Sequence, residues 1–176
     1  MSPIFQFIVK PKGGTQYITE KKIKGRSLIT ASSIEDAFDV NKVGVIVETP
    51  IGYEGDIRIG DEIIVHHNMF RDYYSQNGSI KHSKQYFRDD LYLINWSEIF
   101  MFKSNESQWR PHVDFCILKP SNEPLKGTVI YSNETSLVNK EVGFTTESEY
   151  EVFIDGEMFY RMRNKDICIN YSEGIK

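Results

Sequence analysis

The chain has 176 residues, of which 40% are hydrophobic, 26% charged and 13% aromatic, and its formal net charge is −4. This composition predicts a globular protein with one large or two small domains, and the acidic balance argues against a general nucleic-acid binder. Because no stretch approaches the ~18 apolar residues of a membrane span and the start lacks a signal-peptide pattern, we expect a cytoplasmic protein.

Four short apolar stretches recur in the same order along the chain, each bounded by turn residues. The pairs are 7–11 with 116–120, 43–47 with 126–130, 59–65 with 138–144, and 91–99 with 159–167. The offset between copies falls from 109 (7 to 116) to 83 (44 to 127), then 79 (59 to 138) and 68 (91 to 159). This pattern predicts an internal duplication in which the second copy has shorter loops.

The boundary between the copies is predicted in the polar, proline-containing stretch 104–113. We therefore expect one domain at 1–103 and a second, trimmed domain at 114–176. Short strands separated by turn signals such as Asn77-Gly78 and Asp155-Gly156 predict two tandem small antiparallel β-barrels. Little helix is expected, and the best candidate is a single turn at 32–38, capped by Ser32 or Ser33.

The stretch 60–70, which reads GDEIIVHHNMF, resembles a metal or catalytic site because two histidines stand beside acidic residues. If it is a strand, His67 lies on one side with Ile63 and Val65, while His66 lies on the other. Adjacent strand residues do not readily bind one ion. His82 lies beyond the Asn77-Gly78 turn, but a site built with it lacks an obvious third ligand, so we interpret the stretch as an ordinary strand and expect no metal.

Enzymatic motifs are missing from the rest of the sequence, which contains no G-x-S-x-G elbow, no phosphate-binding G-x-x-x-x-G-K and no C-x-x-C. The carboxylates of Asp89-Asp90 stand beside a turn, where solvated charges are common. Cys116 and Cys168 each lie in an apolar run, which favours free thiols in the core over nucleophiles or a disulfide. We expect no catalytic residues and no cofactor.

The order of these elements resembles that of the GroES-type co-chaperonins, the chaperonin-10 family. Members begin with a strand like Phe7-Ile8-Val9-Lys10-Pro11, followed by a long mobile loop and a G-x-V-V strand like Gly44-Val45-Ile46-Val47. A V-G-D-x-V-x-F strand, here the segment 59–65, and a closing Y-L-I…D-I-L-A pattern, here 92–101, complete the framework. The resemblance covers 5–103 and 114–171. With two tandem domains and shorter loops in one of them, the chain is similar to a divergent, phage-encoded member of this family.

The resemblance implies a docking segment inside the long loop, at residues 12–42. Gly25-Arg26-Ser27-Leu28-Ile29-Thr30 resembles the family's G-G-I-V-L-T segment, whose apolar tripeptide binds an ATP-driven chaperonin ring. Leu28 and Ile29 are then the anchors, and Ser27 and Thr30 flank them, although Ser27 stands where an apolar residue is usual. The alternative is that Leu28 and Ile29 belong to a strand packed in the first barrel.

As a co-chaperonin the protein would cap the chaperonin ring of its host's cytoplasm, assist folding of a client protein and form a homo-oligomeric ring. The aromatic-rich stretch 66–90 is predicted to form an extended hairpin that covers the barrel, makes subunit contacts or recognises a partner. The alternative function keeps the fold without the activity: a non-enzymatic structural or assembly protein, viral or cellular, that uses the barrels for subunit interactions.

Overall fold

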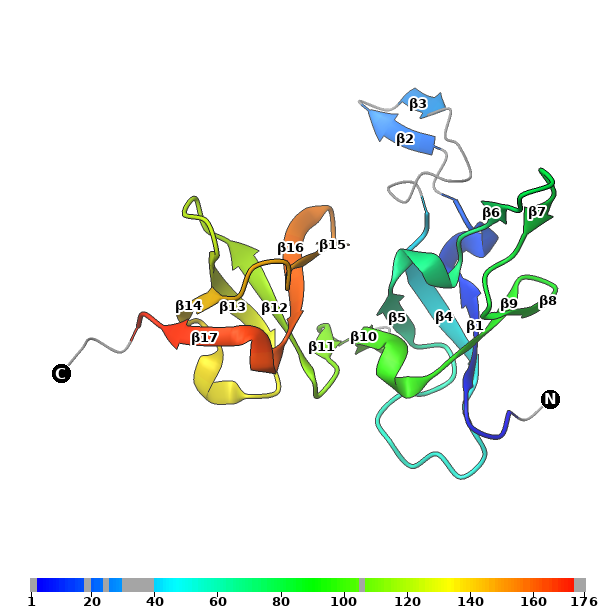
Figure 1. The fold of residues 1–176 in the computed structure, drawn as a ribbon. Helices are drawn as coiled ribbons and strands as arrows, with labels where there is room; N and C mark the ends of the chain where they lie inside the picture. The colour runs from blue at the N-terminus through cyan, green and yellow to red at the C-terminus, as the bar shows by residue number, and fades with distance from the viewer. Residues whose placement is uncertain (1–2, 18–19, 24–25, 30–39, 105–106, 173–176) are drawn as a thin grey trace. The chain divides into compact units, whose positions relative to one another are not determined.

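The computed structural model describes residues 3–17, 20–23, 26–29, 40–104 and 107–172, with the backbone alone at 20–23 and 26–29. The chain divides into two compact units, Met1–Gln108 and Trp109–Lys176. Both are built from short antiparallel strands (Figure 1). The helical segments within the described ranges are three-residue 3-10 turns, η1 Lys12–Gly14, η2 His67–Met69, η3 Trp96–Glu98, η4 Thr135–Leu137 and η5 Asn164–Asp166. The predicted helical turn at 32–38 falls outside the described residues.

The first unit contains one main sheet whose strands lie in the order β10-β5-β4-β1-β9-β8. These strands are β1 Phe7–Pro11, β4 Val43–Glu48, β5 Glu62–Val65, β8 Tyr86–Arg88, β9 Leu91–Ile94 and β10 Ile99–Lys103. Two small hairpins are separate from the main sheet. They are formed by β2 Glu20–Ile23 with β3 Arg26–Ile29, and by β6 Tyr73–Tyr74 with β7 Ile80–Lys81.

The second unit contains a sheet with the order β17-β14-β13-β12-β16-β15. Its strands are β12 Phe115–Pro120, β13 Lys126–Ser132, β14 Glu141–Phe144, β15 Tyr150–Ile154, β16 Glu157–Arg163 and β17 Ile167–Asn170, preceded by the short β11 Arg110–Pro111. The prediction of an all-β, antiparallel fold is confirmed. No pairing among the described residues closes either sheet into a barrel.

The two sheets have the same strand order, and every strand pairing except the outer hairpin, β8–β9 against β15–β16, has the same residue register. Pro11 lies opposite Gly44, and Pro120 lies opposite Gly127, with offsets of 109 (120 − 11) and 83 (127 − 44). The register of β1 against β4 shifts between residues 8 and 9, and that of β12 against β13 shifts between 117 and 118, again 109 apart. The pairings of β5 with β10 and of β14 with β17 likewise differ by 79 and 68 (144 − 65 and 167 − 99). The ladders therefore follow the four offsets seen in the sequence.

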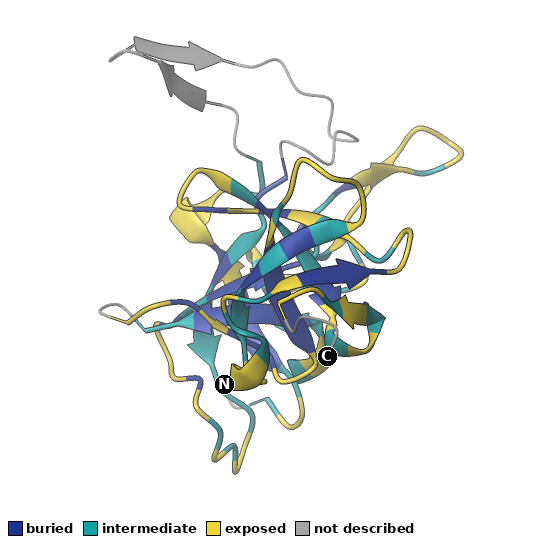
Figure 2. Ribbon diagram, turned by 90° about the vertical axis from the view of Figure 1, so that its left-hand side faces the viewer, coloured by how far each residue is buried: buried dark blue, intermediate teal, exposed yellow. Residues whose placement is uncertain are grey.

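The hydrophobic cores repeat in the same way. Each of six buried side chains in the second core occupies the position of a buried side chain in the first. The corresponding pairs are Cys116 with Phe7, Leu118 with Val9, Val129 with Ile46, Val142 with Ile63, Phe144 with Val65, and Met162 with Ile94. Figure 2 shows this buried layer along the central strands, with exposed residues at the loops. Burying an apolar side chain of this size stabilises the fold by about 1.5–3 kcal/mol. A slip by one residue would expose these side chains, so the alternation of apolar residues determines which face of each strand is buried and the register of its pairing.

Tight turns connect the outer hairpins. Asp89 and Asp90 both have positive φ (50° and 57°) between β8 and β9, and Asp155 and Gly156 (51° and 86°) connect β15 to β16. Two consecutive residues with positive φ form the two-residue turn whose twist matches that of the flanking strands. The predicted turns at Asn77-Gly78 and Asp155-Gly156 are confirmed, and Gly78 has a φ of 78°.

Candidate partner-binding site

The longest difference between the units is the connection from the first strand to the second. In the first unit it spans residues 12–42, whereas in the second only 121–125 separate β12 from β13. Within the long connection β2 and β3 form a hairpin in which Lys21 lies opposite Leu28 and Glu20 lies opposite Ile29. Three of the predicted docking residues, Ser27, Leu28 and Ile29, thus lie on β3. Thr30 lies outside the described residues, as do the side chains of the other three.

Asn41 fixes the base of this long connection, which we call the excursion (residues 12–42). Its side-chain Nδ2 donates to the backbone oxygens of Lys12 (2.8 Å) and Thr15 (3.1 Å), and its Oδ1 accepts from the backbone N–H of Val43 (3.0 Å). The backbone N–H of Asn41 donates to the oxygen of Gln16 over 2.8 Å. Asn41 is only 5% exposed, so these bonds satisfy a buried amide and hold the two ends of the excursion side by side.

Tyr17 ties the excursion to a second insertion. Tyr17 forms a β-bridge with Val40, and its phenolic oxygen accepts a hydrogen bond from the backbone N–H of Asp72 over 2.9 Å. Burial raises the pKa of Tyr17, so its hydroxyl stays neutral at physiological pH. Gln16 donates to the hydroxyl of the buried Tyr92 in the main sheet.

The second insertion runs from residue 66 to residue 85 and contains the hairpin β6–β7 (Figure 1). Phe70 anchors it in the core, where it is fully buried and packs edge-on against Tyr92 with ring centroids 4.9 Å apart. Farther out the apolar side chains are exposed: Tyr73 by 42%, Tyr74 by 50% and Ile80 by 57%. The insertion therefore presents aromatic and aliphatic surface on a root held by the core.

The histidines do not follow the predicted strand alternation. β5 ends at Val65, because Nδ1 of His66 accepts from the backbone N–H of Asn68 (3.1 Å) and starts the 3-10 turn at His67. The prediction that His66 and His67 lie on opposite sides of a strand is therefore wrong. Their rings pack together with centroids 4.1 Å apart. Burial lowers the pKa of His67, and the nearby positive charges of Lys42 and Arg71 lower it further.

His82 is engaged elsewhere. Its Nδ1 lies 2.8 Å from a carboxylate oxygen of Asp72, and its ring stacks on Tyr86 with centroids 4.0 Å apart. Asp72 is 8% exposed, so its carboxylate lies in the root of the hairpin. Within the ranges that the structure describes, no three His, Cys, Asp or Glu side chains are arranged to hold a metal ion.

The two cysteines differ in environment. Cys116 is fully buried, and burial raises its pKa to about 12. Cys168 is exposed on β17, so the prediction that both thiols belong to the core is wrong for this residue. The reason is that β17 is the edge strand of its sheet and its neighbour Ile167 contributes the inward side chain. Both thiols are free.

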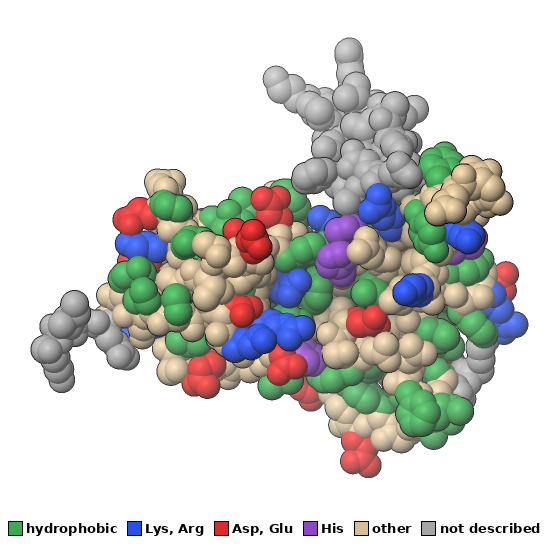
Figure 3. All heavy atoms as spheres, in the orientation of Figure 1, with side chains coloured by type: hydrophobic (Ala, Val, Ile, Leu, Met, Phe, Trp, Pro, Cys, Tyr) green, Lys and Arg blue, Asp and Glu red, His purple; other side chains and the backbone are tan. Residues whose placement is uncertain are grey.

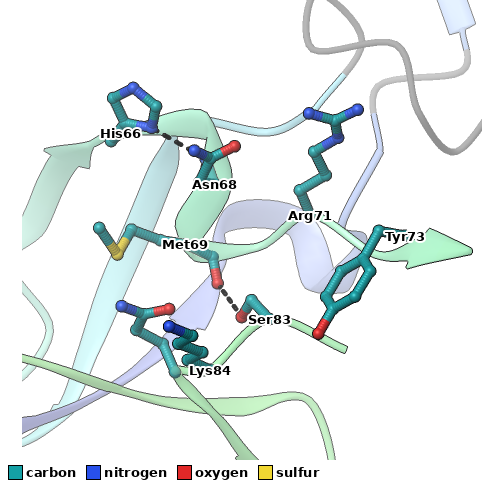
Figure 4. A pocket seen from close by; sticks show the side chains of 8 residues that line it. His66, Asn68, Met69, Arg71, Tyr73, Ser83 and Lys84 are labelled. Carbon is teal, nitrogen blue, oxygen red and sulfur yellow. Dashed lines mark hydrogen bonds between the residues drawn. The ribbon is translucent and has the colours of Figure 1, made fainter. Parts of the chain in front are cut away.

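A hollow of about 500 Å³ lies on the first unit beside the root of the β6–β7 hairpin (Figure 4). It is lined by His66, Asn68, Met69, Arg71, Tyr73, Ser83, Lys84 and Gln85. Ser83 donates to the backbone oxygen of Met69 over 2.6 Å, which joins the two chain segments that form its walls. All of these residues lie within the predicted hairpin 66–90, but they come from two separate stretches without a motif spacing that would indicate a hollow.

The sequence matches no protein-family model, and no curated protein matches it. Across the described ranges, no helix has the length and hydrophobicity needed to traverse a lipid bilayer. The assignment of a function therefore depends on the excursion, the hairpin and the hollow.

Proposed function

We propose that the protein is a non-enzymatic co-chaperonin, which caps an ATP-driven chaperonin ring and assists the folding of a client protein. The excursion carries this proposal. The excursion is a long connection between β1 and β4, whereas five residues join the equivalent strands β12 and β13 in the second unit. The hydrogen bonds of Asn41 fix its two ends. Such an arrangement projects a short recognition segment from a rigid base.

Leu28 and Ile29 are the proposed anchors, flanked by Ser27 and Thr30. Burying each anchor in an apolar groove contributes roughly 1.5–3 kcal/mol before the cost of ordering the segment. One copy would therefore bind weakly and reversibly. Several copies arranged in a ring would bind much more tightly, since each further contact with a symmetric partner is intramolecular.

The test is co-sedimentation with a purified bacterial chaperonin ring, with and without ATP, of the wild type and of the double variant Leu28→Asp/Ile29→Asp. The proposal predicts nucleotide-dependent binding that weakens at least about 100-fold in the variant. Ile4→Asp/Phe5→Asp is the matched control, because both residues are apolar and exposed (65% and 85%) on the same unit but lie outside the excursion.

Equal loss of binding in both double variants would show that general apolar surface, not the excursion, binds the ring. If the wild type fails to bind the ring from its native host as well, the co-chaperonin proposal fails.

A role in assembly is the second candidate, and the edge strand β17 favours it. β17 pairs only with β14 among the described strands, and it presents Ile169 (47% exposed), with Tyr171 (43%) immediately after it. An edge with exposed apolar side chains is able to pair with another chain. This role predicts an oligomer in sedimentation velocity that dissociates in Ile169→Lys, while a monomeric wild type would exclude it.

A further inference from the structure

The lining of the hollow beside the β6–β7 hairpin combines positive charge with neutral hydrogen-bonding groups. Arg71 contributes a guanidinium group, Lys84 an ammonium group and Asn68 an amide. Figure 4 shows Arg71 on the segment that leads into β6 and Lys84 on the segment that returns, so the two cations come from opposite walls. None of the residues that line the hollow is an aspartate or a glutamate.

Two carboxylates near the hollow, those of Glu98 and Asp72, form contacts with other groups. Glu98 accepts from the side chain of Gln85 (3.1 Å) and from the backbone N–H of Asn95 (2.7 Å). Asp72 lies against His82 at 2.8 Å. On the visible face of the first unit, histidine side chains lie near Lys and Arg side chains (Figure 3). Burial is the main cause that lowers the pKa of His67, and the charges of Lys42 and Arg71 lower it further, so Lys42 adds a positive charge near those of the lining.

Two features favour an extended peptide over a nucleic acid as the ligand. First, Tyr73 lines the hollow and belongs to β6, which pairs only with β7 among the described strands, and an extended peptide binds by adding to the edge of such a strand. Second, Met69 adds an adaptable apolar contact, as in surfaces that accept varied peptides. Single-stranded nucleic acids, in contrast, usually bind to a row of aromatic rings within a basic groove, whereas here Tyr73 is the one aromatic side chain of the lining apart from the His66 imidazole.

We propose that this hollow is a binding site for an acidic peptide segment, which lies along β6 and places its carboxylates at Arg71 and Lys84. The site is separate from Leu28 and Ile29 and does not depend on the co-chaperonin activity. A partner or client with a run of Asp or Glu in an extended stretch has the chemistry that the hollow recognises.

The test is fluorescence anisotropy of labelled hexaglutamate with the full chain at low ionic strength, and labelled hexaglutamine is the neutral comparison. Hexaglutamate is expected to bind at least ten-fold more tightly than hexaglutamine and to weaken as salt is added. Lys84→Glu is expected to weaken its binding at least ten-fold. Lys81→Glu makes the same charge change on an exposed residue that does not line the hollow, so it is expected to weaken binding less than three-fold.

Arg71→Lys keeps the charge and separates a loss of binding from a loss of folding, because it is expected to retain most of the affinity. Equal weakening by Lys81→Glu and Lys84→Glu would overturn the proposal, since it would indicate diffuse attraction. Two further outcomes would overturn the proposal. One is that a labelled hexauridylate binds more tightly than hexaglutamate. The other is that inorganic phosphate displaces hexaglutamate more than sodium chloride does at equal ionic strength. Chaperonin binding is expected to survive in Lys84→Glu, which keeps this test distinct from that of the excursion.

Discussion

The phenolic oxygen of Tyr17 accepts a hydrogen bond from the backbone N–H of Asp72 over 2.9 Å. This bond joins two long insertions of the first unit, the excursion at 12–42 and the stretch 66–85. The second unit has only residues 145–149 at the position of the stretch 66–85. The residue that donates also holds His82 through its carboxylate. A substitution at the base of the excursion is therefore expected to alter the local stability of the root of the β6–β7 hairpin.

Tyr17→Phe tests this connection. Removing the hydroxyl leaves the ring in place but deletes the acceptor of the Asp72 N–H. Because such a bond is worth about 0.5–1.5 kcal/mol, the Asp72 amide is expected to exchange with solvent about 2- to 10-fold faster. Hydrogen exchange followed by NMR measures it. The amide of Met69, which donates to the oxygen of His66 in the same insertion, is the internal reference and should not change.

Asn41→Ala is expected to destabilise the first unit. The substitution removes the three hydrogen bonds of the buried Asn41 side chain, so the backbone groups of Lys12, Thr15 and Val43 lose these partners. The expected loss is about 2–4 kcal/mol in the free energy of unfolding, measured by urea denaturation. Asn122→Ala, at an exposed position of the second unit, is the control and should change stability by less than about 0.5 kcal/mol. Equal stability of Asn41→Ala and wild type would contradict a role for this residue in closing the excursion.

Gly127→Ala is expected to disturb the pairing of β12 with β13. A methyl group built at Gly127 would stand 2.8 Å from the backbone oxygen of Lys119, which cannot move without disrupting the ladder. We expect a loss of about 1–3 kcal/mol in the stability of the second unit. At Gly143 the same methyl group meets the ring of the partly exposed Tyr171 at 3.1 Å, and that ring is able to rotate away. Gly143→Ala should therefore be the milder change, and the reverse order in thermal unfolding would refute this account.

The framework of the fold could be predicted from the sequence because the residues that set it are local and repeated. Pro11 and Pro120 end a strand, and Gly44 and Gly127 lie opposite them where the backbones come close, so one motif sets the register in both units. Closure of the sheets into barrels is not seen in the described pairings, since it depends on strand curvature that no local pattern encodes.

The local errors have physical reasons too. His67 continues the apolar alternation of β5 in sequence, yet the ring nitrogen of His66 caps a 3-10 turn and takes the chain out of the strand. Cys168 is exposed because its neighbour Ile167 supplies the inward side chain of the edge strand β17. No sequence motif indicates the hollow lined by Arg71 and Lys84, because it forms only when the β6–β7 hairpin brings two stretches together.

Stability at high pH is expected to depend on Tyr92. Burial is the main cause that raises its pKa from 10.0 to about 12, so the folded chain keeps the proton at pH values where the unfolded chain loses it. The stabilising contribution is complete below pH 10 and is lost as the pH rises toward 12. It corresponds to roughly 3 kcal/mol. Tyr92→Phe should flatten this part of the pH–stability curve, measured by urea denaturation from pH 8 to 12. An unchanged slope would contradict the assignment to Tyr92.

The two thiols are expected to react at very different rates. Cys168 is exposed and should react with a disulfide reagent such as DTNB in the native protein. Cys116 is buried and its pKa is about 12, so it should react only after the second unit unfolds. Cys168→Ser is expected to abolish the fast phase and leave the slow one. Two fast thiols in the wild type would show that the second core is open.

The two units share one scaffold but differ widely in the connection between their first two strands. In each unit the same Pro–Gly pair closes the connection between the first two strands, yet one connection has 31 residues (12–42) and the other 5 (121–125). Closing the longer one costs about 1.6 kcal/mol more in chain entropy, a difference comparable with a few buried hydrogen bonds. Each molecule therefore contains one version of the scaffold with the extra segment and its entropic penalty, and one version without them.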